Sequence, residues 1–209
     1  MQISILREDL LKPLTFVAGV VERRQTLPIL SNVLIRLQQG ELSLAGTDLE
    51  VEVIVKTRSV QGSDGELTVP ARQLLDRCRA LPAQAKIDIK LDKEKAVIKS
   101  GRSRFTLLVL PASDFPSIET TQWERSITLP QKALKELLEK TQFCMAQQDV
   151  RYYLNGLLLE VGADKLRAVA TDGHRLSLAE AELAQAVTGT QQVILPRKGV
   201  LELQRILGN

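Results

Sequence analysis

The sequence predicts an α+β protein built from repeated modules. Residues 3–55 recur at 127–179 with a constant shift of 124 residues, and the alignment of the two copies needs no gap. Along both copies, the period-two apolar alternation of half-buried strands gives way to apolar residues at i, i+4 and i+7, the spacing of amphipathic helices. Two copies of one supersecondary unit indicate an architecture made by repetition.

The duplication can be followed residue by residue. Matching positions at the shift of 124 are Leu10 and Leu134, Leu14 and Leu138, Thr47 and Thr171, and Asp48 and Asp172. A second block, 69–75, meets 195–201 at a shift of 126 residues, as two extra residues in one loop would cause.

The first copy itself divides into two similar halves, each with a strand, a helix and three further strands. The first half is expected to place them at Gln2–Leu6, Glu8–Val21, Val33–Leu37, Glu41–Ala45 and Glu50–Thr57. The second half is expected to place them at Glu66–Val69, Arg72–Leu81, Ile87–Leu91, Ala96–Ser100 and Arg104–Leu110. The alternation of Val51, Val53 and Val55 is typical of these strands, and the spacing of Leu74, Cys78 and Leu81 is typical of these helices.

The expected module boundaries follow from the positions of prolines, from one segment without periodicity and from the way helices cover a sheet. Pro70, Pro130 and Pro196 stand at expected helix starts, and Pro111–Glu124 has no periodicity and is the candidate linker. A helix covers one face of a sheet, so each module is expected to carry its two helices on one side and its strands on the other. We therefore expect one complete domain over 1–121 and a second over 122–209. The second copy ends near the counterpart of Pro82, so roughly 40 residues of that module are expected to lie outside this chain.

Composition limits the function classes. The 209 residues are 44% hydrophobic with a net charge of +3, and no apolar run approaches the about 18 residues of a membrane span. Charged residues 7–9 interrupt the position where a signal peptide needs an apolar segment, which favours a cytoplasmic protein. Cys78 and Cys144 are expected to be core thiols, with a disulfide left open, and their spacing indicates no metal site and no cofactor.

Catalytic motifs are missing. The chain holds no phosphate-binding Gly-rich loop, dinucleotide fingerprint or nucleophile elbow. Asp172 and His174, the only histidine, could be read as a hydrolase pair, but the Thr-Asp dipeptide also stands at Thr47 and Asp48 without a histidine. The repeat favours a strand-to-strand turn, with a binding surface in the second copy, because Asp and Thr side chains bond nearby backbone amides.

Polar residues at equivalent positions suggest a DNA-facing surface. Arg24 matches Gln148, and Arg72 matches Lys198. Quasi-symmetric modules would place these groups on one face, where cations meet phosphate regardless of base sequence. The alternative is an ordinary solvated helix face.

Tyr152 and Tyr153 are the only tyrosines of the chain. Neighbouring side chains of an extended segment point to opposite sides, so we expect one ring to pack inward and the other to offer a stacking surface for a base. Packing of both rings in the core is the alternative.

Longer motifs identify a family. Segments 24–30 (RQTLPIL), 100–105 (SGRSRF), 148–156 (QDVRYYLNG), 170–176 (ATDGHRL) and 196–200 (PRKGV) resemble the beta sliding clamps of bacterial DNA polymerase III. The resemblance implies the DNA-clamp fold, a head-to-tail homodimeric ring of three domains per chain, with helices on the inner face and antiparallel sheets on the outer face. It implies a non-catalytic ring around duplex DNA that tethers the polymerase for processive synthesis. It also implies that domain two is cut short here and that the third domain is missing, so the chain is expected not to close a ring.

The resemblance assigns three sets of residues. The DNA-binding set is Arg24, Arg72, Gln148, Tyr152, Tyr153 and Lys198. A pocket for short linear peptides of the polymerase, clamp loader and repair proteins would include Arg151, Leu154, Thr171, Gly173, His174, Arg175 and Leu176. The subunit interface would use Arg102, Arg104, Phe105 and Leu107, leaving an exposed apolar patch without a partner. Gln73 departs from the basic residue common in similar clamps. A peptide-docking scaffold that never meets DNA is the alternative function.

Overall fold

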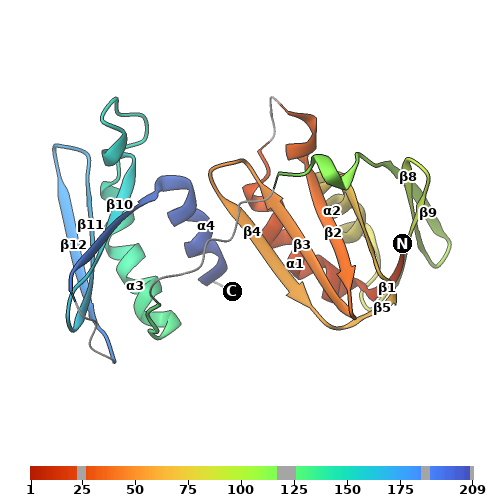
Figure 1. Ribbon diagram of the computed structural model, residues 1–209, viewed down its shortest axis with the longest axis horizontal. Helices are drawn as coiled ribbons and strands as arrows, with labels where there is room; N and C mark the ends of the chain where they lie inside the picture. Colours follow the sequence, from red (N-terminus) through yellow and green to blue (C-terminus); the bar gives the residue numbers. More distant parts are fainter. Residues whose placement is uncertain (23–26, 117–125, 185–188, 208–209) are drawn as a thin grey trace. The chain divides into compact units, whose positions relative to one another are not determined.

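The chain forms two compact units, Met1–Thr120 and Thr121–Asn209, which are described separately. The computed structural model describes residues 1–22, 27–116, 126–184 and 189–207. Figure 1 shows both units, coloured along the sequence.

Unit 1 alternates strands with two α-helices. Its strands are β1 (Gln2–Leu6), β2 (Asn32–Gln38), β3 (Glu41–Thr47), β4 (Glu52–Thr57), β5 (Val60–Ser63), β6 (Gly65–Pro70), β7 (Lys86–Asp92), β8 (Lys95–Ser100) and β9 (Ser103–Leu108). Its helices are α1 (Arg7–Val20) and α2 (Ala71–Ala80), with 3-10 turns η1 (Pro28–Ser31) and η2 (Ala112–Asp114). Each predicted element of this unit is present within two residues of its expected ends, and the α+β fold class is confirmed.

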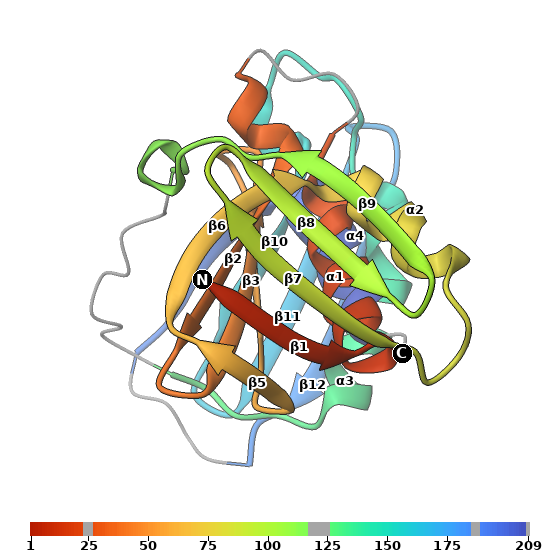
Figure 2. The ribbon, with the colours of Figure 1, turned by 90° about the vertical axis from the view of Figure 1, so that its right-hand side faces the viewer.

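The strands of unit 1 form two antiparallel sheets that exchange their first strands. One sheet has the order β4-β3-β2-β6 and the other β5-β1-β7-β8-β9, the second being visible in front in Figure 2. Thus β1, from the first half of the module, pairs with β7 of the second half, and β6 pairs with β2 of the first. The exchange ties the two halves into one core.

The two helices of unit 1 pack against each other, and each has an arginine in its first two residues that reaches the end of the other. The Arg7 guanidinium donates to the carbonyls of Cys78 (2.9 Å) and Arg79 (3.3 Å) in the last turn of α2. Arg72 donates in turn to the Val21 carbonyl (2.8 Å), at the C-cap of α1. The last carbonyls of a helix have few intrahelical partners and carry its partial negative charge, so each arginine supplies a charged donor to the C-terminal end of the other helix.

Unit 2 repeats the part of this plan that holds α1, β2, β3, β4, β6 and α2. It contains α3 (Gln131–Thr141), β10 (Gly156–Val161), β11 (Lys165–Thr171), β12 (Leu176–Glu182), β13 (Gln191–Pro196) and α4 (Arg197–Leu207), with 3-10 turns η3 (Gln142–Cys144) and η4 (Tyr152–Leu154). The sheet order β12-β11-β10-β13 matches β4-β3-β2-β6 strand for strand. The predicted repeat is therefore present at the level of topology.

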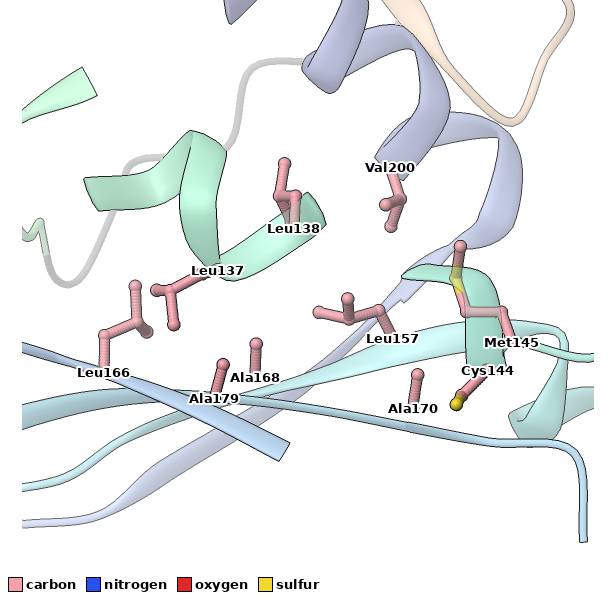
Figure 3. Close-up of a cluster of buried hydrophobic side chains, with 10 residues drawn as sticks. All are labelled: Leu137, Leu138, Cys144, Met145, Leu157, Leu166, Ala168, Ala170, Ala179 and Val200. Carbon is pink, nitrogen blue, oxygen red and sulfur yellow. The ribbon is translucent and has the colours of Figure 1, made fainter. Parts of the chain in front are cut away.

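The core of unit 2 lies between its helices and one face of its sheet. Leu137 and Leu138 of α3 and Val200 of α4 are buried against inward-facing sheet residues, of which Leu157 and Ala168 are fully covered. Figure 3 shows these side chains meeting between the helices and the strands. The predicted layering, with both helices on one side of the sheet, is confirmed for this unit.

The sequence did not predict β5, which pairs antiparallel with β1 at the sheet edge. Its four residues include a single large apolar side chain, Val60, so they carry no strand periodicity. The strand fits because Gly62 approaches the Gln2 carbonyl so closely that an added Cβ would overlap it. Glycine at this position is required by a contact distant in sequence.

Candidate DNA and peptide interfaces

The Thr-Asp dipeptide builds the same turn in both units. In unit 2 the Thr171 hydroxyl accepts from the Gly173 amide (3.1 Å), and the Asp172 carboxylate accepts from the amides of His174 and Arg175 (both 3.0 Å). In unit 1 the corresponding acceptors take the amides of residues 49, 50 and 51 at 3.0, 3.0 and 2.8 Å. The predicted strand-to-strand turn is confirmed.

Asp172 is committed to this turn. The backbone amides of His174 and then Arg175, together with the Arg175 side chain, lower the pKa of its carboxyl to about 2. Arg175 Nε donates to the carboxylate at 3.0 Å. A carboxylate held in this way stabilises the backbone, which argues against the hydrolase interpretation of Asp172 and His174.

The turn presents its other side chains to solvent. His174, Arg175 and Leu176 are exposed, and the Arg175 guanidinium also lies 5.9 Å from the ring centre of Phe143, a cation–π geometry. Phe143 is itself exposed, and the sequence did not indicate it as a site residue. The exposure of Phe143 depends on how the 3-10 turn η3 packs in the fold, so no local sequence pattern could have indicated it.

A second loop, residues 149–155, is fixed beside this turn. The Asn155 amide accepts from the Asp149 backbone and donates to its carbonyl, at 2.9 and 2.8 Å. Arg151 binds the Asp149 carboxylate with both Nε and Nη2 at 2.9 Å, and this pairing lowers the pKa of Asp149 to about 2. A bidentate arginine pair fixes the guanidinium plane.

The loop and the turn meet at Gly173 and Arg151. A Cβ on Gly173 would lie 3.2 Å from Arg151 Nη2, and Gly173 has a φ of 88°. Glycine therefore allows both the backbone conformation and the close approach of the guanidinium. Of the predicted pocket set, the structure brings these two into contact and places Thr171 in the same turn.

The outer face of the unit 2 sheet carries an apolar row. Pairing registers align Leu178 with Val169, Val169 with Leu158, and Leu158 with Ile194. Leu178 and Ile194 are exposed, as is Leu176 on the same strand as Leu178. Leu154, by contrast, is buried and supports the loop. The predicted pocket set omitted Leu178, which the alternation from Leu176 could have indicated.

The expectation for the tyrosines is wrong. Tyr152 and Tyr153 lie in the 3-10 turn η4 instead of an extended segment, and their side chains are 82% and 50% exposed. The two rings meet edge to face, with centroids 5.9 Å apart. Leu154 is the residue that packs inward, because the 3-10 turn directs the side chains differently from a strand. Both rings are accessible to a ligand, and neither belongs to the core.

The cationic candidates stand at the starts of the second helices. Arg72 is exposed at the second position of α2, although one of its nitrogens is bonded to the Val21 carbonyl. Lys198 holds the matching position of α4, and its neighbour Arg197 donates to the Met145 carbonyl at 3.1 Å. That bond joins the α4 N-terminus to the segment that leads to the exposed Gln148. Arg24 lies outside the described residues.

The expected apolar interface on β9 needs a correction. Leu107 is 4% exposed and faces the core, so it cannot form an exposed patch. Leu108 is 68% exposed, while Arg104 and the half-buried Phe105 lie on the same edge strand. The exposed face of β9 therefore holds Arg104, Thr106 and Leu108, and not Phe105 and Leu107 as expected. Arg102 lies in the turn that precedes this strand.

Within the described ranges there is no cluster of three or more residues suited to a metal ion, and no helix long and apolar enough to cross a membrane. Cys78 and Cys144 are free and buried, as expected for core thiols. Burial raises the pKa of the Cys78 thiol to about 12, so the thiolate needed for reactivity is not formed.

A helix-backed antiparallel module that is repeated in the same register, with cations at equivalent helix starts and an accessible loop-and-turn surface, defines a protein of the DNA-clamp fold. The chain belongs to the DNA polymerase III beta subunit family. Residues 1–119 match the family's N-terminal domain, and residues 128–209 match its central domain.

Similar proteins agree with this assignment. The beta sliding clamp of Pseudomonas putida is 56% identical over 208 residues, which cover 99% of this chain and 57% of that protein. The crystal structure of the DNA polymerase III subunit beta from Pseudomonas aeruginosa superimposes with a TM-score of 0.95 at 52% identity, covering 99% of this chain and 57% of the other. Another Pseudomonas aeruginosa clamp, bound to griselimycin, has a TM-score of 0.94 at 53% identity over 99% of this chain and 56% of that one. The chain thus spans less than two thirds of the relatives it matches.

Proposed function

We propose that this chain provides the first domain, 1–121, and part of the second, 122–209, of a cytoplasmic sliding clamp. In the whole protein, two chains of three domains would join head to tail around duplex DNA. The ring would catalyse no reaction and would tether the replicative polymerase during synthesis. The observation that carries the proposal is the repeated module, with Arg72 and Lys198 at the same position of α2 and α4.

The proposed DNA contact is electrostatic and independent of base sequence. Arg24, Arg72, Gln148 and Lys198 would face phosphate, and Tyr152 and Tyr153 would offer two accessible rings. Weak contacts of this kind permit sliding, because each phosphate is exchanged for an equivalent one. Retention then depends on ring closure and not on tight binding.

The test uses the protein extended beyond Asn209 to the length of its relatives. Its retention on nicked circular DNA is compared before and after the circle is cut. We expect retention on circles and loss from linear ends. Equal retention on both forms would contradict the topological tether.

The loop and turn around Arg151 and Gly173 support a second role, the docking of short linear peptides from the polymerase, the clamp loader and repair proteins. Leu176 offers an exposed aliphatic contact, and Thr171, His174 and Arg175 line the same turn. The fixed guanidinium of Arg151 would pair with a polar group of the peptide. A scaffold that docks peptides without DNA is the alternative function, and this surface is the observation in its favour.

Griselimycin provides a probe for this surface, since a Pseudomonas aeruginosa relative binds it. We expect Leu176→Ser to weaken its binding to the extended protein at least tenfold. Leu49→Ser, which changes a similarly exposed leucine of unit 1, is the matched control. Equal weakening by both variants would argue against a pocket at Leu176. Binding of griselimycin with no DNA retention would favour the scaffold.

A further inference from the structure

Unit 1 carries a groove on the outer face of its β4-β3-β2-β6 sheet, and none of the residues assigned above lines it. The groove encloses about 750 Å³, which is within the usual range for ligand sites. Strands β2, β3 and β4 form its floor, and Ala112 and Phe115 form one wall.

The floor consists of two rows of side chains that cross the three strands. The apolar row is Leu34, Ala45 and Ile54, which are paired in register. The first two are covered, in part by Phe115, whereas Ile54 is 50% exposed. The groove therefore offers one accessible aliphatic contact.

The polar row lies two residues further along the same strands and consists of Arg36, Ser43 and Lys56. Its centre is a hydroxyl, with a cation on either side. Arg36 is paired with Glu66 at 2.9 Å, and Lys56 shares the single carboxylate of Glu41 with Arg58, at 2.9 and 3.4 Å. One carboxylate between two cations leaves an excess of positive charge at the Lys56 end of β4. Glu52 also lines the groove, but it lies four residues, or about 13 Å, back along the same strand.

The equivalent row in unit 2 has the opposite pattern. There Arg167 stands at the centre between Glu160 and Glu180, with bonds of 2.8 and 2.7 Å. That row satisfies its own central charge, whereas the unit 1 row presents cations around an uncharged centre. An anionic group placed over Ser43 would find a cation on each neighbouring strand, about 5 Å away at the spacing of a sheet.

We propose that this groove is a second docking site, for an extended peptide segment with an acidic side chain over Ser43 and an aliphatic side chain against Ile54. Residues i and i+2 of a strand lie on one face and are about 7 Å apart, as the two rows are. The bound segment therefore has one residue between the aliphatic and the acidic residue. The site is independent of the peptide surface proposed for unit 2.

The test titrates the isotope-labelled 209-residue chain with capped peptides and follows its backbone amides by NMR. The probe is Gly-Ser-Leu-Ser-Asp-Ser-Gly, and the spacing control is Gly-Ser-Leu-Asp-Ser-Ser-Gly, of identical composition. We expect the probe to shift the amides of β3 and β4 in a saturable manner and to bind at least fivefold more tightly than the control.

Variants locate the site. Lys56→Glu is expected to weaken the probe at least tenfold and Ile54→Ala at least threefold. Lys90→Glu makes the same charge change on an exposed lysine of the other sheet and is expected to have no effect. Leu176→Ser, on unit 2, is likewise expected to leave the binding unchanged. The amide spectra show that each variant remains folded.

Several results would overturn the proposal. These are the absence of saturable shifts in β3 and β4, equal binding of both peptides, and equal loss of binding in Lys56→Glu and Lys90→Glu, which would indicate unspecific charge attraction. Shifts confined to unit 2 or shifts that depend on protein concentration without peptide would also overturn it, the latter by showing that the face binds a second copy. None of these results bears on DNA retention or on griselimycin binding.

Discussion

Leu49 and Gly173 occupy the same corner of two copies of one turn, with φ angles of 80° and 88°. In both copies the threonine hydroxyl accepts from the amide of this residue, which fixes it in a left-handed conformation. Glycine adopts that conformation freely, whereas leucine is strained in it. The two copies thus share one backbone conformation but differ in the residue that adopts it, and only the glycine of unit 2 adopts it without strain.

Replacement of Leu49 by glycine is therefore expected to stabilise unit 1. Relief of the positive φ contributes about 1–2 kcal/mol, and the greater chain entropy of glycine offsets about 0.5–1 kcal/mol of it. Little packing is removed, because Leu49 is exposed. Urea unfolding followed on unit 1 amides should show a gain of about 0.5–1 kcal/mol. Glu50→Gly, at the next exposed position, should destabilise, and a decrease in stability in Leu49→Gly would refute the assigned strain.

Arg7 is expected to contribute more to the free energy of unfolding than the exposed arginines of unit 1. Its side chain is 18% exposed and joins the start of α1 to the last turn of α2 through the carbonyls of Cys78 and Arg79. Arg7→Met keeps the aliphatic stem but removes the charged donor from both carbonyls, of which Cys78 keeps only its 3.3 Å bond from the Leu81 amide, so we expect a decrease of about 2 kcal/mol in the free energy of unfolding in urea. Arg77→Met, on the exposed side of α2, should cost less than about 0.5 kcal/mol. Similar decreases in the two variants would contradict the capping role.

The comparison between sequence and structure separates local from distant causes. Period-two and helical spacings located the predicted strands and helices of unit 1, because burial of one face requires apolar residues at regular intervals along the sequence. Strand β5 has no such regular apolar spacing, since Gly62 is required by its close contact with the backbone of β1. The exchange of β1 and β6 between the sheets is likewise a long-range property.

The candidate site shows the same division. The Thr-Asp turn was predictable, because its hydrogen bonds join residues within three positions of one another. The accessibility of Tyr152 and Tyr153 was not, because it depends on the 3-10 turn that Asp149 and Asn155 hold in place. The contact of Arg151 with Gly173 joins two loops, and only the fold reveals it.

The turn in unit 2 is expected to weaken only in strong acid. The folded pKa of Asp172, about 2, lies below its ordinary value of 3.8, so its ionised form stabilises the folded turn. That contribution is complete above about pH 4 and disappears as the pH falls through about 2. The carboxyl carbon of Asp172 should titrate near pH 2 in NMR spectra, and the amide of His174 should follow the same curve. In Asp172→Asn the His174 amide should lose this response, whereas a midpoint near 3.8 would show that the carboxylate is not held by the turn.

The proposed DNA surface makes a quantitative prediction about salt. Each cation that binds a phosphate of duplex DNA releases counterions, so the slope of log K against log salt changes by about 0.9 for each such cation that is removed. We expect Arg72→Gln and Lys198→Gln each to reduce the slope by about that amount when the 209-residue chain binds a duplex of about 30 base pairs. The reduction should be the same for duplexes of different sequence, since binding to phosphate carries no base information.

Controls separate this DNA effect from changes in the fold. Lys90→Gln, on an exposed lysine outside the proposed surface, should leave the slope unchanged. Gln148→Ala should lower affinity without changing the slope, because glutamine releases no counterion. Arg72→Gln should also lower stability by about 1 kcal/mol because its bond to the Val21 carbonyl is removed, so its slope must be measured where the variant is fully folded. Equal slope changes in Lys90→Gln and Lys198→Gln would mean that the chain attracts DNA by its overall charge, and the assignment of a DNA-facing surface would fail.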